Sequence, residues 1–149
     1  MKKILFSALA CASLLSYGCG SDGVVGLDST VCQSQTVLPS AMNAKTFQSW
    51  VEGTNDTFWK CSVSSSGVQL TNILNLVLTE DGALLYTSEV IKKSLKADTW
   101  SQLSCDSIKL KDGTVFSGMN VQNQKLTLNA TNKGELLTLD CQLETGILP

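Results

Sequence analysis

From Phe58 to Leu143 the sequence alternates apolar and polar side chains with a period of two residues. The alternation is clearest near the C-terminus, where Leu126, Leu128 and Ala130 are separated by polar residues. Because successive side chains of a β-strand point to opposite faces, this pattern predicts strands with one buried and one solvent-facing side. A chain built in this way has to bury one face of an antiparallel sheet.

Short glycine-containing sequences separate the alternating segments. Glu80-Asp81-Gly82, Asp112-Gly113 and Asn132-Lys133-Gly134 each lie between two segments, and Gly, Asp and Asn are favoured in tight turns. The strands predicted on this basis span residues 58–63, 70–79, 83–91, 104–111, 114–121, 125–131 and 135–143. Strands joined in this order predict a mainly β protein. We expect an antiparallel meander that closes into a small barrel, or a sandwich, because closure removes exposed edges.

One segment before the strands has the apolar spacing of a short helix. The predicted helix covers residues 41–51, with Ser40 as its N-cap and Gly53 at its end. Phe47 and Trp50 lie on its apolar stripe.

The N-terminus has the composition of an export signal. Met1-Lys2-Lys3 is cationic, and the run from Ile4 to Leu15 is apolar and shorter than the about 20 residues of a membrane-spanning helix. The run is followed by Ser16-Tyr17-Gly18-Cys19, which resembles the lipobox of bacterial lipoproteins. In that family the cysteine is diacylated and becomes the new N-terminus after cleavage.

The lipobox resemblance implies a signal peptide over residues 1–18 and a lipid anchor on Cys19. Gly20 rather than Asp follows this cysteine, which in the family implies sorting to the outer membrane. Two acyl chains suffice for stable anchoring, so we expect the periplasmic side of that membrane or the cell surface. Two alternatives stay open, namely lipidation of Cys11 and an ordinary signal peptide without lipidation.

The mature chain divides into a tether and one domain. Residues 19–38 begin with several glycines and have little periodicity, which is typical of a flexible segment. Residues 39–149 hold the helix and all the predicted strands, and we expect them to form a single β-barrel-like domain.

Four cysteines remain after the leader and the anchor: Cys32, Cys61, Cys105 and Cys141. An even number in an exported chain predicts two disulfides, and the sequence allows three pairings. None of the four belongs to a Cys-x-x-Cys pair, which argues against a zinc site or a redox centre.

The order of features in the mature chain resembles a known group of proteins. The predicted helix is followed by Gly53 and by a first strand containing Trp59-Lys60-Cys61, and later segments carry Tyr86 and Cys105. Over residues 47–143 this order resembles small lipocalin-like bacterial lipoproteins.

The resemblance implies a lipocalin-like barrel whose cup binds a small apolar or amphipathic ligand. It also implies the pairing Cys61–Cys105, which leaves Cys32–Cys141. The candidate ligand-binding residues are Trp59, Tyr86 and Trp100.

Composition excludes several other functions. The chain has no His, and its 11 basic residues are all Lys against 13 acidic ones. His-dependent catalysis, His-ligated metals and Arg forks are therefore excluded, and the net charge of −2 disfavours nucleic acid. The carboxylates Glu80, Asp81 and Asp112 lie in predicted turns, where Asp bonds locally. We expect a monomer without enzymatic activity, cofactor or metal.

The longest predicted loop covers residues 92–99 and precedes Trp100. Loops often carry binding sites, and this one holds Lys92, Lys93 and Lys96, a cluster that is more often simply solvated. Trp100 is the candidate for an exposed residue beside this loop. The alternative to the ligand carrier is a protein-binding envelope module, such as an inhibitor of a cell-wall enzyme, or a structural surface lipoprotein.

Overall fold

The computed structural model describes residues 37–87 and 91–146 of the 149-residue chain. The helices are α1 (Leu38–Ala41) and α2 (Phe47–Glu52), and a 3-10 turn spans Lys92–Ser94. The strands are β1 (Asp56–Ser65), β2 (Val68–Thr79), β3 (Gly82–Tyr86), β4 (Trp100–Ser104), β5 (Ser107–Leu110), β6 (Val115–Gln122), β7 (Lys125–Asn132) and β8 (Glu135–Gly146). None of the helices in these described ranges is long and apolar enough to cross a membrane.

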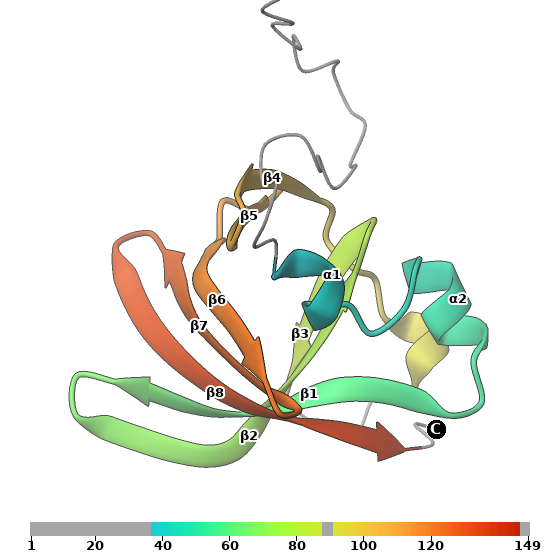
Figure 1. The fold of residues 1–149 in the computed structure, drawn as a ribbon, viewed down its shortest axis with the longest axis horizontal. Helices are drawn as coiled ribbons and strands as arrows, with labels where there is room; N and C mark the ends of the chain where they lie inside the picture. Colours follow the sequence, from blue (N-terminus) through green and yellow to red (C-terminus); the bar gives the residue numbers. More distant parts are fainter. Residues whose placement is uncertain (1–36, 88–90, 147–149) are drawn as a thin grey trace, which may run out of the picture.

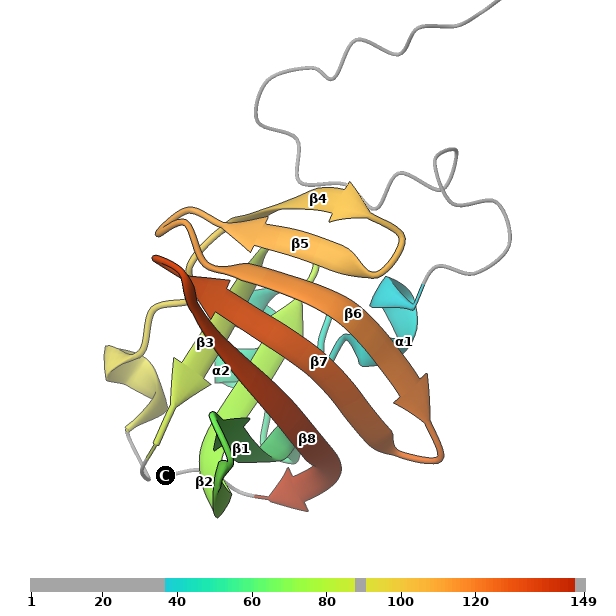
Figure 2. The same cartoon turned by 90° about the vertical axis from the view of Figure 1, so that its left-hand side faces the viewer.

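The eight strands form one antiparallel sheet in the order β3-β2-β1-β8-β7-β6-β5-β4. Every strand pairs with its neighbour in sequence except at one seam between β3 and β4, and the first strand pairs with the last. The sheet curls into a half-barrel (Figures 1 and 2). Ala83 and Asp98 bridge the seam through two backbone hydrogen bonds of 2.8 and 2.9 Å. The predicted mainly β meander is confirmed.

The interior of the half-barrel is filled by apolar side chains from all eight strands and from α1. The inward positions predicted from the alternation are confirmed, since Trp59, Leu76, Leu128 and Leu139 are all buried. Helix α1 adds Leu38 and Ala41 to the same cluster, at the concave side of the sheet (Figure 1). Side chains of the protein itself therefore fill this interior.

A second, smaller core lies on the opposite face of β2 and β3. Trp50 of α2 packs there with Val77, Leu84 and Tyr86. The Phe47 and Trp50 rings stack with their centroids 5.6 Å apart. The predicted apolar stripe of the helix therefore packs against the outer face of the sheet and not against the interior of the half-barrel.

The single helix predicted over residues 41–51 is wrong, because two shorter helices occupy this region. Asn43 interrupts the helix by bonding to β2 through its backbone N–H and its side-chain Oδ1, both to Leu78. Helix α2 is capped by Thr46 in a capping box rather than by Ser40. The predicted end at Gly53 is confirmed.

The middle of the chain also differs from the predicted strands. The strand predicted over residues 83–91 ends at Tyr86. The strand predicted over 104–111 corresponds to β5 and the last residue of β4, and β4 itself was not predicted. Cys105 lies in the turn between these two strands. The alternation does not mark this turn because it contains neither Gly nor Pro.

The disulfide pairing implied by the resemblance is wrong. Cys61 is bonded to Cys141, with the two Cα atoms 3.9 Å apart. These residues are opposite each other on β1 and β8, and both face the interior. Cys105 is also disulfide-bonded. Structural stapling by disulfides is confirmed, whereas the pairs Cys61–Cys105 and Cys32–Cys141 are not formed.

The signal peptide, Cys11, Cys19 and most of the predicted tether lie outside the described residues. Leu38, placed at the end of the tether, is instead a fully buried residue of α1. The described chain begins beside the β4–β5 turn, where the Val37 N–H donates to the Cys105 carbonyl at 3.3 Å.

Candidate functional site

The structure brings two of the predicted ligand-binding residues together inside the half-barrel. Trp59 and Trp100 are both 2% exposed and belong to one cluster. Their Nε1 atoms donate to the carbonyls of Ala41 and Thr79, each at 2.8 Å. The expectation of an exposed Trp100 is wrong, because the tryptophan packs across the seam against the end of β2.

Tyr86 does not join the two tryptophans, since it faces the core under α2. Its hydroxyl has no hydrogen-bond partner among the described residues. Burial disfavours the phenolate and raises the pKa of Tyr86 to about 12. A ligand role for Trp59, Tyr86 and Trp100 stays a prediction, and the three residues do not form one site.

One lysine of the cluster in the predicted loop is buried rather than solvated. Lys92 is buried and forms an ion pair with Asp56. Its Nζ also donates to the carbonyls of Trp50 and Gly53, at 3.2 and 3.0 Å, and lies 5.1 Å from the Trp50 ring centroid. Burial lowers the pKa of Lys92. Lys92 thus fastens the loop to α2 and β1, and the interpretation of a solvated cluster is wrong for it.

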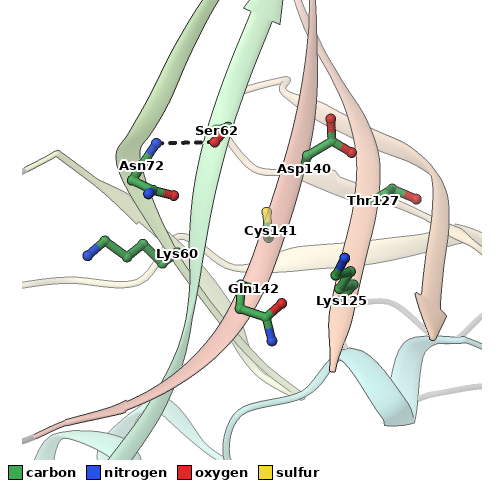
Figure 3. Close-up of a pocket in the computed structure, with 8 residues that line it drawn as sticks. All are labelled: Lys60, Ser62, Asn72, Lys125, Thr127, Asp140, Cys141 and Gln142. Carbon is green, nitrogen blue, oxygen red and sulfur yellow. Dashed lines mark hydrogen bonds between the residues drawn. The ribbon is translucent and has the colours of Figure 1, made fainter. Parts of the chain in front are cut away.

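A hollow of ≈ 300 Å³ lies on the outer face of the sheet, over β1, β8 and β7 (Figure 3). We call it the polar hollow, and it is lined by Lys60, Ser62, Asn72, Lys125, Thr127, Asp140, Cys141 and Gln142. A second depression of ≈ 260 Å³ adjoins it over the β6–β7 hairpin and shares Lys125 and Thr127.

The strand register arranges the polar side chains in two rows that cross the sheet. In the first row Gln142 is the cross-strand partner of both Lys60 and Lys125. In the second row Asp140 is the partner of both Ser62 and Thr127. On β6 the rows continue at Gln122 and Asn120, which line the second depression.

Most of these side chains form no hydrogen bond within the described part of the protein. Within the described residues, the one side-chain hydrogen bond in the two rows joins the Asn72 N–H to the Ser62 Oγ at 3.2 Å. A third row, one step further along the strands, behaves differently, since Thr138 donates to Asn129 at 3.0 Å. The first two rows therefore present free donors and acceptors on a rigid support.

The β1–β2 hairpin projects from the rest of the sheet, and part of β2 has a free edge. Strand β3 pairs with residues 75–79 of β2, so residues 68–74 have no partner among the described strands on that side. Val68, Leu70 and Ile73 are 63%, 52% and 39% exposed. A bulge interrupts the register between Leu70 and Leu74.

No metal centre among the described residues and no matching family indicates what the protein does. The described residues contain no group of Cys, Asp and Glu that could hold a metal ion. No protein-family model, curated protein or solved structure matches the chain.

The rows of the polar hollow and the free edge are absent from the sequence predictions. A signal for the rows exists in the polar positions of the alternating strands, such as Lys60 and Ser62. Which of these positions become neighbours depends on strand register, because a shift by one residue turns every side chain to the other face.

Proposed function

We propose that this chain is a non-enzymatic, lipid-anchored envelope protein that binds another protein through the free edge of β2. In this proposal Cys19 carries the acyl anchor, the signal peptide directs the chain to the outer membrane, and the curled sheet is a lipocalin-like barrel. The free edge, with its exposed apolar side chains, is the observation that carries the proposal.

The packing of the interior favours protein binding over the carriage of a small apolar ligand. Trp59, Trp100 and Phe116 are buried together with Leu38 of α1. A ligand bound among these side chains would have to displace them, which costs about 2–5 kcal/mol for each large side chain removed from a core. A partner that binds to the surface of the barrel displaces no buried side chain and avoids this cost.

The β2 edge has a bulge between Leu70 and Leu74, but it lacks two other features by which proteins protect such edges, charged side chains and Pro. Residues 68–79 contain no charged side chain and no Pro, although Lys and Pro are the usual protection of an exposed strand. Unpaired backbone groups offer main-chain hydrogen bonds to an added strand, and exposed alternate side chains add specificity. The Leu70 side chain lies beside its cross-strand partner Val63 on the inward face.

The occupant we propose is an extended segment of another envelope protein, with apolar residues at alternate positions. Seven residues of edge extend over about 23 Å, which gives a strip of a few hundred Å². A stable dimer needs about 800 Å² from each partner, so pairing of two copies through this strip alone falls short. A flexible segment of another protein, in contrast, adds contacts on either side of the strand that it forms at this edge.

The start of the described chain supports this orientation. Val37 lies beside the β4–β5 turn, and Figures 1 and 2 both place the β1–β2 hairpin on the opposite side of the sheet. Cys19 precedes Val37 by 18 residues, so a flexible tether has a root-mean-square span of about 23 Å. In this proposal the hairpin faces away from the anchor and is open to soluble partners.

The proposal is tested by placing a photo-crosslinking amino acid at Gln69 in the full-length protein in its own cells. The matched control carries the same amino acid at the exposed Lys109 on β5. We expect Gln69 to crosslink to an apolar-alternating segment of one partner, identified by mass spectrometry, and Lys109 not to do so.

A synthetic peptide of that segment then provides the quantitative test. Leu70→Lys places a charge on the edge, and we expect it to weaken peptide binding about tenfold, as measured by fluorescence anisotropy. Crosslinks between copies of this chain, or equal binding by Leu70→Lys, would overturn the proposal.

A further inference from the structure

We propose that the polar hollow and its adjoining depression bind a polyhydroxylated chain, that is, a glycan strand. This site goes beyond the proposed protein-binding edge and shares one lining residue with it, Asn72. It lies mainly on the outward face of β1, β8, β7 and β6, and Asn72 of β2 lines it from the side (Figure 3).

The side chains of the hollow match the chemistry of sugar hydroxyls. Gln142 and Gln122 carry both a donor and an acceptor, and Thr127 does so with one hydroxyl. Each sugar hydroxyl also donates and accepts, so rows of amides and hydroxyls satisfy it without requiring a fixed charge. Asp140, between Ser62 and Thr127, adds a carboxylate acceptor, which forms stronger hydrogen bonds than a neutral acceptor.

The arrangement also fits a chain better than a small molecule. Each row crosses four strands, from Lys60 to Gln122 and from Ser62 to Asn120, which corresponds to a length of about 14 Å. The two depressions adjoin through the shared residues Lys125 and Thr127. A ligand can therefore extend along the rows over several linked sugar rings.

Other ligand classes fit the hollow less well. An apolar ligand finds no apolar side chain along either row. A phosphate group is favoured by converging cations, but Figure 3 shows Lys60 and Lys125 on opposite sides of Gln142, with Asp140 nearby. The described residues contain one ion pair, Lys92 with Asp56, so these two lysines and Asp140 are not paired with each other.

The second observation that points to a ligand is that the polar side chains of the hollow lack hydrogen-bond partners among the described residues. Ser64, Thr138 and Asn129 in the third row are joined by internal hydrogen bonds. In the polar hollow, Lys60, Gln142, Lys125, Thr127 and Asp140 form no side-chain hydrogen bond to any other described residue. The strands fix the backbone positions of these groups, so a ligand that bonds to them has to order only the side chains and not the backbone.

The test measures binding of the mature full-length protein to two glycans. The first probe is peptidoglycan sacculi cleared of bound protein, in a pelleting assay. The second is the polysaccharide of lipopolysaccharide freed of its lipid, in a calorimetric titration. We expect saturable binding to one of them, and the probe that binds identifies the source of the glycan.

Variants show whether binding uses this hollow. Thr127→Trp fills the hollow from an exposed strand position, and Gln142→Ala removes the central amide; we expect each to weaken binding tenfold or more. Ser101→Trp is the matched control, because it places the same ring on an exposed position of β4, and it should bind as the wild type does. Circular dichroism confirms folding of each variant.

Two results would overturn the inference. One is the absence of saturable binding to both probes, and the other is equal binding by Thr127→Trp and the wild type. Leu70→Lys, the edge variant, should keep full glycan binding, so that failure of the edge proposal and failure of this inference are told apart.

Discussion

Raising the pH from 9 to 12 should remove the stabilisation that Tyr86 contributes to this protein. In the folded state the phenol is buried under α2, its hydroxyl has no hydrogen-bond partner among the described residues, and its pKa is about 12. In the unfolded chain the pKa of tyrosine is about 10. Between these values the unfolded state releases a proton that the folded state keeps, so the free energy of unfolding falls as pH rises.

The size of the effect follows from the two pKa values. A difference of about 2 units corresponds to about 2.7 kcal/mol, at about 1.36 kcal/mol for each unit. This stabilisation is fully present below pH 10 and is lost as the pH rises through 12. Because net stabilities are about 5–15 kcal/mol, the loss is readily measured.

Two assays check this prediction on the chain without residues 1–18, which removes Tyr17 and leaves Tyr86 as the single tyrosine. Absorbance at 295 nm should report ionisation near pH 12 in the folded protein and near pH 10 in concentrated urea. Urea unfolding at several pH values should show the fall in stability.

The control variant for this prediction is Tyr86→Phe. It should lose the alkaline change in absorbance and most of the alkaline fall in stability. At pH 7 it should be as stable as the wild type or more so, since an unpaired buried hydroxyl costs about 1–3 kcal/mol. A titration midpoint near pH 10 in the folded wild type would refute the reasoning.

Three further predictions concern the cross-links and the buried ion pair. Replacing Cys61 and Cys141 together by Ala should lower the free energy of unfolding by about 4.5 kcal/mol, because the bond closes a loop of 80 residues; guanidinium unfolding measures this, and a loss under about 1 kcal/mol would contradict it. Non-reducing peptide mapping should join Cys105 to Cys32, because Cys11 is expected to be removed with the leader and Cys19 to be acylated; a Cys105 peptide joined elsewhere would exclude this. Lys92→Met should cost about 3–5 kcal/mol by leaving a buried carboxylate unpaired, and a second apolar replacement at that carboxylate should restore most of the stability, as followed by thermal unfolding.

The sequence predicted correctly those features that depend on neighbouring residues. The inward positions of β1, β7 and β8 follow from the period of two, since a strand turns alternate side chains to one face whatever its partner. The turns at Gly113 and Gly134 have positive φ values of 94° and 85°, which Gly adopts without strain. These elements need no information from distant parts of the chain.

The failures share a physical origin in contacts between distant residues. Asn43 leaves the helix to bond with Leu78, 35 residues away, and no local preference predicts this. The pairing Cys61–Cys141 depends on the adjacency of the first and last strands. That adjacency follows from closure of a meander, so the predicted barrel already contained a signal for the pair that the resemblance obscured.

The candidate sites were predictable only in part. The outward polar positions of the strands are visible in the sequence, but Gln142 becomes the neighbour of Lys60 and Lys125 only through register. The free edge of β2 arises because β3 ends at Tyr86, and the alternation continues past that residue.

The bond between Cys61 and Cys141 has a consequence for how the protein is made. Cys32 and Cys105 both precede Cys141 in the sequence, so in a chain exported from its N-terminus the thiol of Cys61 meets Cys32 and then Cys105 before Cys141 arrives. An oxidase acting on the emerging chain therefore forms a non-native cross-link first. Exchange through a mixed disulfide corrects it, and we expect maturation of this protein to depend on a disulfide isomerase.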